Sequence, residues 1–175
     1  ALLLSAAVWG IMLLYYFFNP NRIVIGLDNL DLKEILGRIY RPLLERMGEN
    51  ESDIFVYTDI RSAEISKHTA NAFLATKISF VNMIADLCTK VGANVEDVAR
   101  SIGMDPRIAS GFLKPGIGFG GSCLPKDLAA FIQVGKINEI DFSFLEEVNK
   151  INELRISNYI KQLIKVLGNL TDKTL

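Results

Sequence analysis

Apolar residues recur with two different periods, which divide the chain into a short N-terminal part and a long helical part. Residues 22–26 and 54–58 are runs rich in β-branched and aromatic residues, which predict two strands. Between them, residues 31–47 repeat apolar side chains every three or four positions, which predicts an amphipathic helix with Pro42 inside it. A polar turn is expected at 48–53. This order predicts one βαβ unit, too small to form a sheet domain alone.

From about Ser62 onward, the pattern becomes almost entirely helical. Apolar residues continue at helical spacing to Val91, so we expect a helix of about 30 residues that ends at Gly92. Asn94 predicts the N-cap of the next helix, and Gly103 is expected just after its end.

A glycine-rich loop at 111–122 separates these helices from two more, expected at about 124–134 and 142–167. Residues 168–175 predict a turn that leads into a strand. The fold class is therefore mostly α, with a long helix and a small βαβ element.

Residues 1–18 carry no charge. Their length just suffices for a membrane span, and a buried core segment explains the same composition. Both interpretations stay open from the pattern alone. A signal peptide is less favoured, because the stretch has no basic start and no small-residue cleavage site.

Composition excludes several classes of protein. Half of the 175 residues are hydrophobic, which excludes a disordered chain, and the net charge of −1 without a basic stripe disfavours nucleic acid as a partner. Cys88 and Cys123 fit neither a disulfide scaffold nor a zinc-ligand spacing, and His68 is the only histidine, so no metal site is expected. Cys88 lies mid-helix, where core packing is the better interpretation.

The loop is the segment most informative about chemistry. Residues 116–121 formally match G-x-G-x-x-G, but no strand precedes them and no βαβ unit surrounds them, so we reject a dinucleotide-binding turn. The glycines do allow a tight backbone whose free N–H groups approach a ligand closely.

Cys123 follows this loop at the predicted start of a helix. Ser122 is a candidate N-cap, and Pro125 suits the first turn. The helix dipole and Lys126 both favour a thiolate there, and Asp127 lies one turn on along the same face. The alternative, a small buried hydrophobe in a glycine-rich loop, is about equally supported.

Other polar residues are ambiguous by themselves. Lys67 and Asn71 are spaced to project from one helix face, where they could donate hydrogen bonds to an oxyanion or simply face solvent. We expect His68 on an exposed or interfacial face. Arg107 and Lys114 lie beside prolines, where they could hold phosphates or be ordinary loop cations.

Several of these segments together resemble one known family. GFGGSCLPKD at 118–127, preceded by FLKPGI, resembles the active-site loop of the UDP-glucose 6-dehydrogenases, in the wider UDP-glucose/GDP-mannose dehydrogenase family. Residues 63–88 resemble the central helix of that family, and 19–26 and 91–108 resemble the segments before and after it. The resemblance covers about 19–175.

The resemblance implies an enzyme that oxidises the C6 alcohol of UDP-glucose, or of a related nucleotide sugar, to a carboxylate in two NAD-dependent steps. Cys123 matches the nucleophile, which forms a thiohemiacetal and then a thioester. Lys67 and Asn71 match the residues that stabilise the oxyanion, and Asp127 matches a carboxylate implicated in acid–base work.

It also implies positions that bind substrate and cofactor. Cys123 and Lys126 border the NAD site of the family, and the arginine that matches Arg107 reaches substrate across the dimer interface. The implied substrate-binding residues are Arg107, Lys114, Gly118, Phe119 and Gly120.

The family's domain order implies the divisions of this chain. Residues 1–60 would be a remnant of the NAD-binding α/β domain, 61–168 the central helical dimerisation and active-site domain, and 169–175 the start of the UDP-binding domain. The family carries a glutamate that takes part in hydrolysis upstream of NPNRIVIG, whereas residues 1–27 contain no acidic residue. We therefore interpret 1–18 as a non-native or degenerate edge rather than an anchor, which makes a membrane partner unexpected.

The expectation is thus a fragment of a cytoplasmic enzyme of polysaccharide-precursor metabolism that forms a homodimer through the long helix. We expect no dehydrogenase turnover from the 175 residues alone, since the NAD-binding glycine loop is missing. The alternative is a non-catalytic helical dimerisation module that retains a remnant of the active-site loop.

Overall fold

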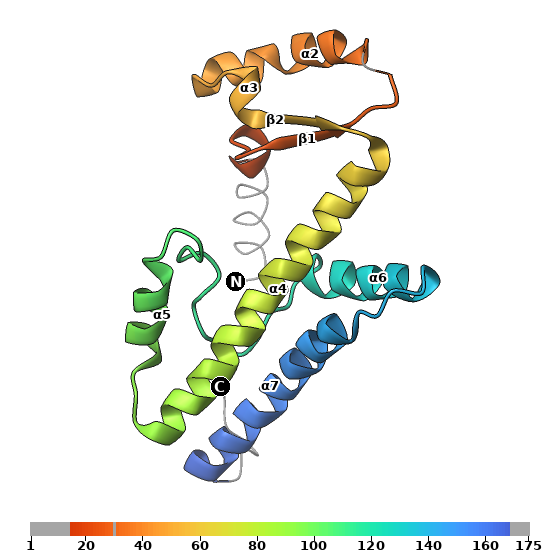
Figure 1. Cartoon of the computed structure of the whole chain (residues 1–175). Coiled ribbons are helices and arrows are strands. Elements are labelled where there is room, and N and C mark those ends of the chain that lie inside the picture. Colours follow the sequence, from red (N-terminus) through yellow and green to blue (C-terminus); the bar gives the residue numbers. More distant parts are fainter. Residues whose placement is uncertain (1–14, 30, 169–175) are drawn as a thin grey trace. The chain divides into compact units, whose positions relative to one another are not determined.

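The computed structural model describes residues 15–29 and 31–168 (Figure 1). The chain divides into two compact units, residues 1–66 and 67–175. The segments 1–14 and 169–175, and with them the apolar opening up to residue 14 and the expected final strand, lie outside the described residues.

Unit 1 is the predicted βαβ element. Strand β1 (Ile23–Gly26) leads to helix α2 (Leu32–Met47), which passes through Pro42 without ending, then to the short helix α3 (Glu51–Ile54) and strand β2 (Phe55–Thr58). The strands pair in parallel, with Ile23 opposite Phe55. The polar turn expected at 48–53 is partly wrong, because acidic residues in the first turn of α3 favour a helical turn there.

Aromatic rings hold unit 1 together. The buried side chains are Leu44, Ile54 and Phe55. The ring of Phe55 lies 5.5 Å from that of Tyr40, edge-on, and 5.5 Å from that of Tyr57, stacked. Burial of these rings joins α2 to β2 on one face of the two-stranded sheet.

The long predicted helix is confirmed as α4 (Ile60–Val91). Gly92 has the left-handed φ of +74°, and the N–H of Ala93 donates to the carbonyl of Cys88 at 2.9 Å, which ends the helix as expected. Cys88 is buried, as predicted. Asn94 caps α5 (Val95–Gly103) by accepting the N–H of Glu96; the helix includes Gly103 rather than ending before it.

Two further helices complete unit 2, α6 (Leu124–Ile137) and α7 (Ser143–Leu167). Helix α6 runs three residues beyond the predicted end at 134. The core of unit 2 joins α4, the glycine-rich loop, α6 and α7; its buried members are Ala72, Ala75, Phe119, Leu128, Ile132 and Val148.

Helices α4 and α7 run alongside one another in the same direction (Figure 1). The Ser79 hydroxyl donates to the carbonyl of Val148 at 3.0 Å, and Asp86 pairs with Arg155. Each contact joins residues 69 positions apart, and the second lies seven residues further along both helices. Seven residues are about two helical turns, so one face of α4 meets one face of α7 in parallel register.

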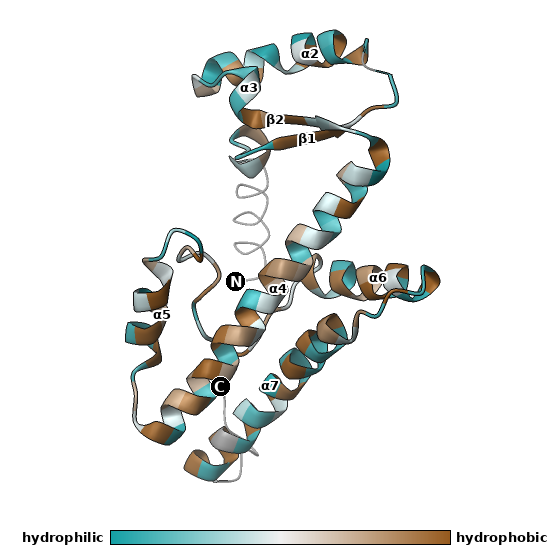
Figure 2. Cartoon of the chain, in the orientation of Figure 1, coloured by the Kyte–Doolittle hydropathy of each residue, from teal (hydrophilic) through white to brown (hydrophobic). Residues whose placement is uncertain are grey.

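Apolar residues extend along much of α4 (Figure 2). Among the described helices, α4 is the one that is long and apolar enough to cross a membrane. In its most apolar 18-residue stretch, 39% is buried within the chain. Ala72 and Ala75 of α4 belong to the buried core of unit 2, and Ile78 packs against it, whereas Phe73, Phe80 and Leu87 are exposed.

Candidate active site

Helix α6 begins at the cysteine. Cys123 occupies the N-cap position with no side-chain capping bond, so the expectation that Ser122 caps the helix is wrong. The Ser122 hydroxyl lies instead 3.7 Å from the Cys123 sulfur. Pro125 is in the first turn, as predicted. Cys123 is exposed, so its thiol lies at the positive end of a 14-residue helix and accessible from solvent.

Asp127 is the buried carboxylate of this site. It is only 4% exposed, and its backbone N–H donates to the carbonyl of Cys123 at 2.9 Å, which confirms the one-turn spacing. The Asn71 amide donates to Asp127 Oδ2 at 2.6 Å, and Lys126 Nζ lies 3.8 Å from Oδ1. One carboxylate oxygen of Asp127 thus accepts a hydrogen bond, and the other lies near an ammonium group. Helix α4 therefore brings Asn71 to the start of α6.

Lys67 lies one turn before Asn71 on α4 and is exposed. Within the described part of the chain, its ammonium forms no hydrogen bond or ion pair, which leaves it available to a ligand. His68 is half-buried, and its ring lies 6.0 Å from that of Phe131, almost parallel to it. The expected exposed or interfacial position of His68 is therefore wrong, because α6 supplies an aromatic ring that covers it.

The glycine-rich loop is held by side chains that the sequence did not single out. The amide of Asn152, on α7, accepts the N–H of Phe119 at 2.7 Å and donates to its carbonyl at 2.9 Å. Asn82, on α4, accepts the N–H of Gly116 at 2.8 Å, and Arg155 Nε donates to the Gly116 carbonyl at 2.9 Å. These three residues, which we call the loop clamp, fix both backbone groups at two points of the loop.

The loop clamp explains one glycine. Gly118 has a φ of +118°, and a Cβ there would lie 2.5 Å from Asn152 Oδ1. Neither the backbone conformation nor the space admits a side chain. Gly120 has open space around it.

The other residues proposed to bind substrate are divided between core and surface. Phe119 is buried in the core of unit 2, whereas Lys114 and Gly120 are exposed. Arg107 is exposed and forms a bidentate pair with Asp105, with a shortest distance of 2.6 Å. This guanidinium lowers the pKa of Asp105 below its usual range. These three surface positions remain predictions.

No metal site or nucleotide turn is found among residues 15–29 and 31–168. No group of three histidine, cysteine or acidic side chains gathers there. The glycine-rich loop follows turns rather than a strand, which confirms that 116–121 is not a dinucleotide-binding turn. In unit 1, β1 leads into α2 through Leu27, Asp28 and Asn29 without a glycine-rich turn. Residues 15–29 and 31–168 therefore contain no glycine-rich strand-to-helix turn of the kind that binds the pyrophosphate of a dinucleotide.

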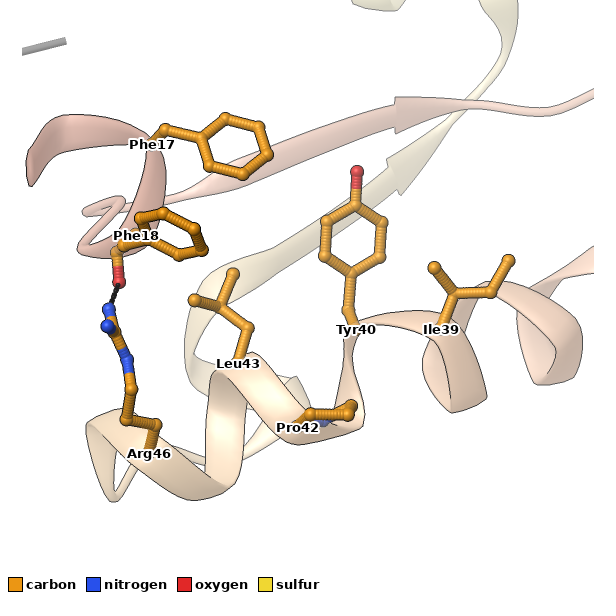
Figure 3. A pocket seen from close by; sticks show the side chains of 7 residues that line it. All are labelled: Phe17, Phe18, Ile39, Tyr40, Pro42, Leu43 and Arg46. Carbon is orange, nitrogen blue, oxygen red and sulfur yellow. Dashed lines mark hydrogen bonds between the residues drawn. The ribbon is translucent and has the colours of Figure 1, made fainter. Parts of the chain in front are cut away.

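Unit 1 contains a separate apolar cavity of about 400 Å³. Figure 3 shows its lining, in which Arg46 reaches back to the carbonyl of Phe18 and lies over the Phe18 ring. Among the described residues that line this cavity, Arg46 is the charged one and is engaged with the chain itself, and no pair of catalytic groups converges there. Unit 2 is the better candidate for chemistry.

Comparison with known proteins places the chain in a family. Residues 61–154 match the sequence model of the UDP-glucose/GDP-mannose dehydrogenase family, central domain. The chain is 43% identical over 160 residues to a UDP-glucose 6-dehydrogenase of Rickettsia felis, covering 91% of this chain and 35% of the relative. It is 44% identical over 163 residues to UDP-glucose 6-dehydrogenase YwqF of Bacillus subtilis, covering 93% and 35%.

A solved structure shows the same fold. The UDP-glucose dehydrogenase of the hyperthermophilic archaeon Pyrobaculum islandicum superposes with a TM-score of 0.80 at 33% identity, over 89% of this chain and 34% of that one. The chain thus spans about a third of the length of the relatives it matches. With the family match covering more than half of its residues, the chain belongs to the UDP-glucose/GDP-mannose dehydrogenase family, and residues 61–154 correspond to the central domain.

Proposed function

We propose that this chain supplies the nucleophile-bearing part of a dehydrogenase that oxidises the C6 alcohol of UDP-glucose to a carboxylate, with NAD as the oxidant of the complete protein. Family membership and the activities of the relatives support this substrate. One observation of the structure carries the proposal. The exposed Cys123 lies one helical turn before a buried carboxylate that Asn71 engages from another helix.

The residues of this chain divide the covalent chemistry among them. The Cys123 thiolate adds to the C6 aldehyde carbon, which forms a C–S bond and places negative charge on the former carbonyl oxygen. The exposed ammonium of Lys67 and the amide of Asn71 are the donors proposed for that oxyanion. The second oxidation removes a hydride from this carbon and leaves a thioester on Cys123.

Asp127 is the proposed acid–base group for the final step. Its carboxylate accepts a proton from a water molecule as that water adds to the thioester carbonyl. The C–S bond then breaks, which restores the thiolate of Cys123 and forms the carboxylic acid. The acid leaves as the carboxylate after losing its proton to solvent, and Asp127 releases the proton it took from water. The described residues contain no glycine-rich strand-to-helix turn for the pyrophosphate of NAD, and we expect both hydride transfers to depend on parts of the complete protein that bind the dinucleotide.

A chimeric enzyme tests the proposal directly. The matched 160-residue segment of the R. felis UDP-glucose 6-dehydrogenase is replaced by the corresponding residues of this chain, and NADH formation from UDP-glucose is followed by absorbance. We expect turnover, and we expect Cys123→Ala to lower kcat by roughly a thousandfold or more, because the covalent step is lost. The 175 residues alone should form no NADH.

The second cysteine provides the matched control. Cys88→Ala removes a buried thiol on α4. It should change kcat by less than about threefold in the same chimera, because a buried cysteine acts as a small hydrophobe. A folded chimera without turnover would favour the alternative function, a non-catalytic helical module with a remnant of the loop.

A second copy of the chain is the proposed partner of α4. The exposed apolar side chains of Phe73, Phe80 and Leu87 recur every seven residues along the helix, opposite to residues that pack in the core. A stripe with this period suits helix-to-helix association. Sedimentation velocity should show a dimer that Phe80→Glu converts to monomer, whereas Lys90→Glu, an exposed charge near the end of α4, leaves it intact.

A further inference from the structure

Cys123 ends a short exposed arch between two buried anchors. The four residues from Gly120 to Cys123 are all exposed. On one side, Phe119 is 7% exposed and packs in the core of unit 2; on the other, Leu124 packs against the same core. A four-residue arch has few conformations once both of its ends are fixed, so the anchors determine how the thiol is presented.

One of these anchors depends on Asn152. The side chain of Asn152 is the partner of both backbone groups of Phe119, at 2.7 Å and 2.9 Å, and Asn152 is 9% exposed. A primary amide carries an acceptor oxygen and a donor nitrogen on the same carbon, so it can pair with both backbone groups of one residue, as a neighbouring antiparallel strand does. Leucine, which has a similar volume, provides neither group.

The other two residues of the loop clamp hold the backbone that precedes Phe119. Asn82 and Arg155 hold the N–H and the carbonyl of Gly116, three residues before Phe119. Arg155 is itself paired with Asp86, and its side chain is 15% exposed. Gly118, between the two fixed points, turns with a φ of +118° directly under Asn152. Side chains of the packed helices α4 and α7 therefore hold the backbone that leads to Cys123.

We propose that Asn152 is a positioning residue, which acts through Phe119 to hold the Gly120–Cys123 arch in the conformation that presents the Cys123 thiol at the N-terminus of α6. That the positioned thiol attacks a substrate rests on the proposed function. That Asn152 positions the thiol does not, because this can be measured from the reactivity of Cys123 in the chain itself.

The test uses the full 175-residue chain and two substitutions. Asn152→Leu keeps most of the volume and removes both polar groups, and Asn152→Ala removes the volume as well. Asn149→Leu and Asn149→Ala are the matched controls, because Asn149 lies one turn earlier on α7 and its amide bonds to Glu153 of the same helix. Circular dichroism and urea unfolding establish which variants fold.

The first readout is hydrogen exchange at Phe119. Loss of two buried hydrogen bonds is expected to speed exchange of its amide by roughly tenfold or more in both Asn152 variants, while the Asn149 variants match the unmodified chain. Unchanged exchange at Phe119 would overturn the assignment, as would unfolding of both Asn152 variants beside folded Asn149 controls.

The second readout separates positioning from simple structural support. Iodoacetamide should alkylate Cys123 about threefold or more slowly in both Asn152 variants, because the Gly120–Cys123 arch no longer holds the exposed sulfur at the N-terminus of α6. An alkylation rate equal to or above that of the unmodified chain would overturn the proposal. An inactive chimera would contradict the proposed function, yet it would leave both of these readouts unaffected.

Discussion

The two units of the chain bury different kinds of side chain. Among the described residues of unit 1, the buried side chains are Leu44, Ile54 and Phe55, all of them apolar. Unit 2 has a larger apolar core and also buries four polar side chains, Ser79, Asn82, Asp127 and Asn152.

The four polar side chains serve the region around Cys123. Asp127 lies one turn from the cysteine, Asn82 and Asn152 hold the loop before it, and Ser79 ties α4 to α7. A buried polar group without a hydrogen-bond partner costs free energy. When it is hydrogen-bonded, the directionality of the bond favours one packing arrangement of the surrounding chain. The comparison teaches that the described core of unit 1 is made of apolar side chains alone, whereas unit 2 uses buried hydrogen bonds to specify the geometry of a site.

The largest expected effect comes from core substitutions that should destabilise one unit and leave the other folded. Phe55→Ala removes the ring that joins α2 to β2 and should cost unit 1 about 3–5 kcal/mol, and Leu128→Ala should cost unit 2 about 2–5 kcal/mol. Hydrogen exchange resolved by peptide measures both. Phe55→Ala should deprotect β1 and β2 while α6 stays protected, and Leu128→Ala should do the reverse.

Exposed residues of the same types are the controls. Phe144 is 66% exposed and Leu154 is 50% exposed, so Phe144→Ala and Leu154→Ala should change the free energy of unfolding by less than about 0.5 kcal/mol. If Phe55→Ala deprotected α6 as strongly as β2, the two units would be one cooperative structure and the comparison between them would fail.

An intermediate effect is expected where the loop clamp meets the backbone. Gly118→Ala forces a side chain into a φ of +118° and against Asn152 Oδ1, so we expect a loss of about 1–3 kcal/mol, measured by urea unfolding. Gly120→Ala, two residues on, has open space and should be nearly neutral. Equal effects of the two substitutions would show that the clamp does not hold the loop in solution.

Local features of the chain were predictable from its sequence. The end of α4 at Gly92, the cap at Asn94 and the spacing of Cys123 and Asp127 each depend on residues within five positions of one another. Propensity and periodicity report such short-range geometry directly.

The loop clamp was not predictable in this way. Asn152 meets Phe119 across 33 residues, and Arg155 meets Asp86 across 69. These contacts exist only after α4 and α7 pack in parallel register, which no local pattern determines. The available indication was weak: polar residues interrupt the apolar faces of both helices, Asn82 and Asp86 on α4, Asn152 and Arg155 on α7. His68 escaped prediction for the same reason, because its covering ring comes from α6.

The smallest expected effect concerns the hydrogen bond between Tyr57 and Glu51 in unit 1. The Tyr57 hydroxyl donates to Glu51 Oε1 at 2.6 Å. Burial, this hydrogen bond and the charge of Glu51 raise the pKa of Tyr57 to about 12. Because the folded pKa lies above the ordinary value of 10.0, the contribution of this pair is fully present below pH 10 and is lost as the pH rises from 10 to 12. It should amount to less than about 1 kcal/mol, since solvent screens a partly exposed pair.

Phenolate absorbance measures this directly, because one tyrosine should ionise well above pH 10 and the high component should vanish in Tyr57→Phe. Glu51→Gln removes the carboxylate charge while keeping an acceptor, so it should lower the pKa of Tyr57 only part of the way toward 10.0, the remainder being due to burial. If Glu51→Gln left the titration unchanged, burial alone would account for the raised pKa, and unit 1 would be specified by apolar contacts throughout. A partial shift would show that unit 1 also uses a directional polar contact, at its surface rather than in its core.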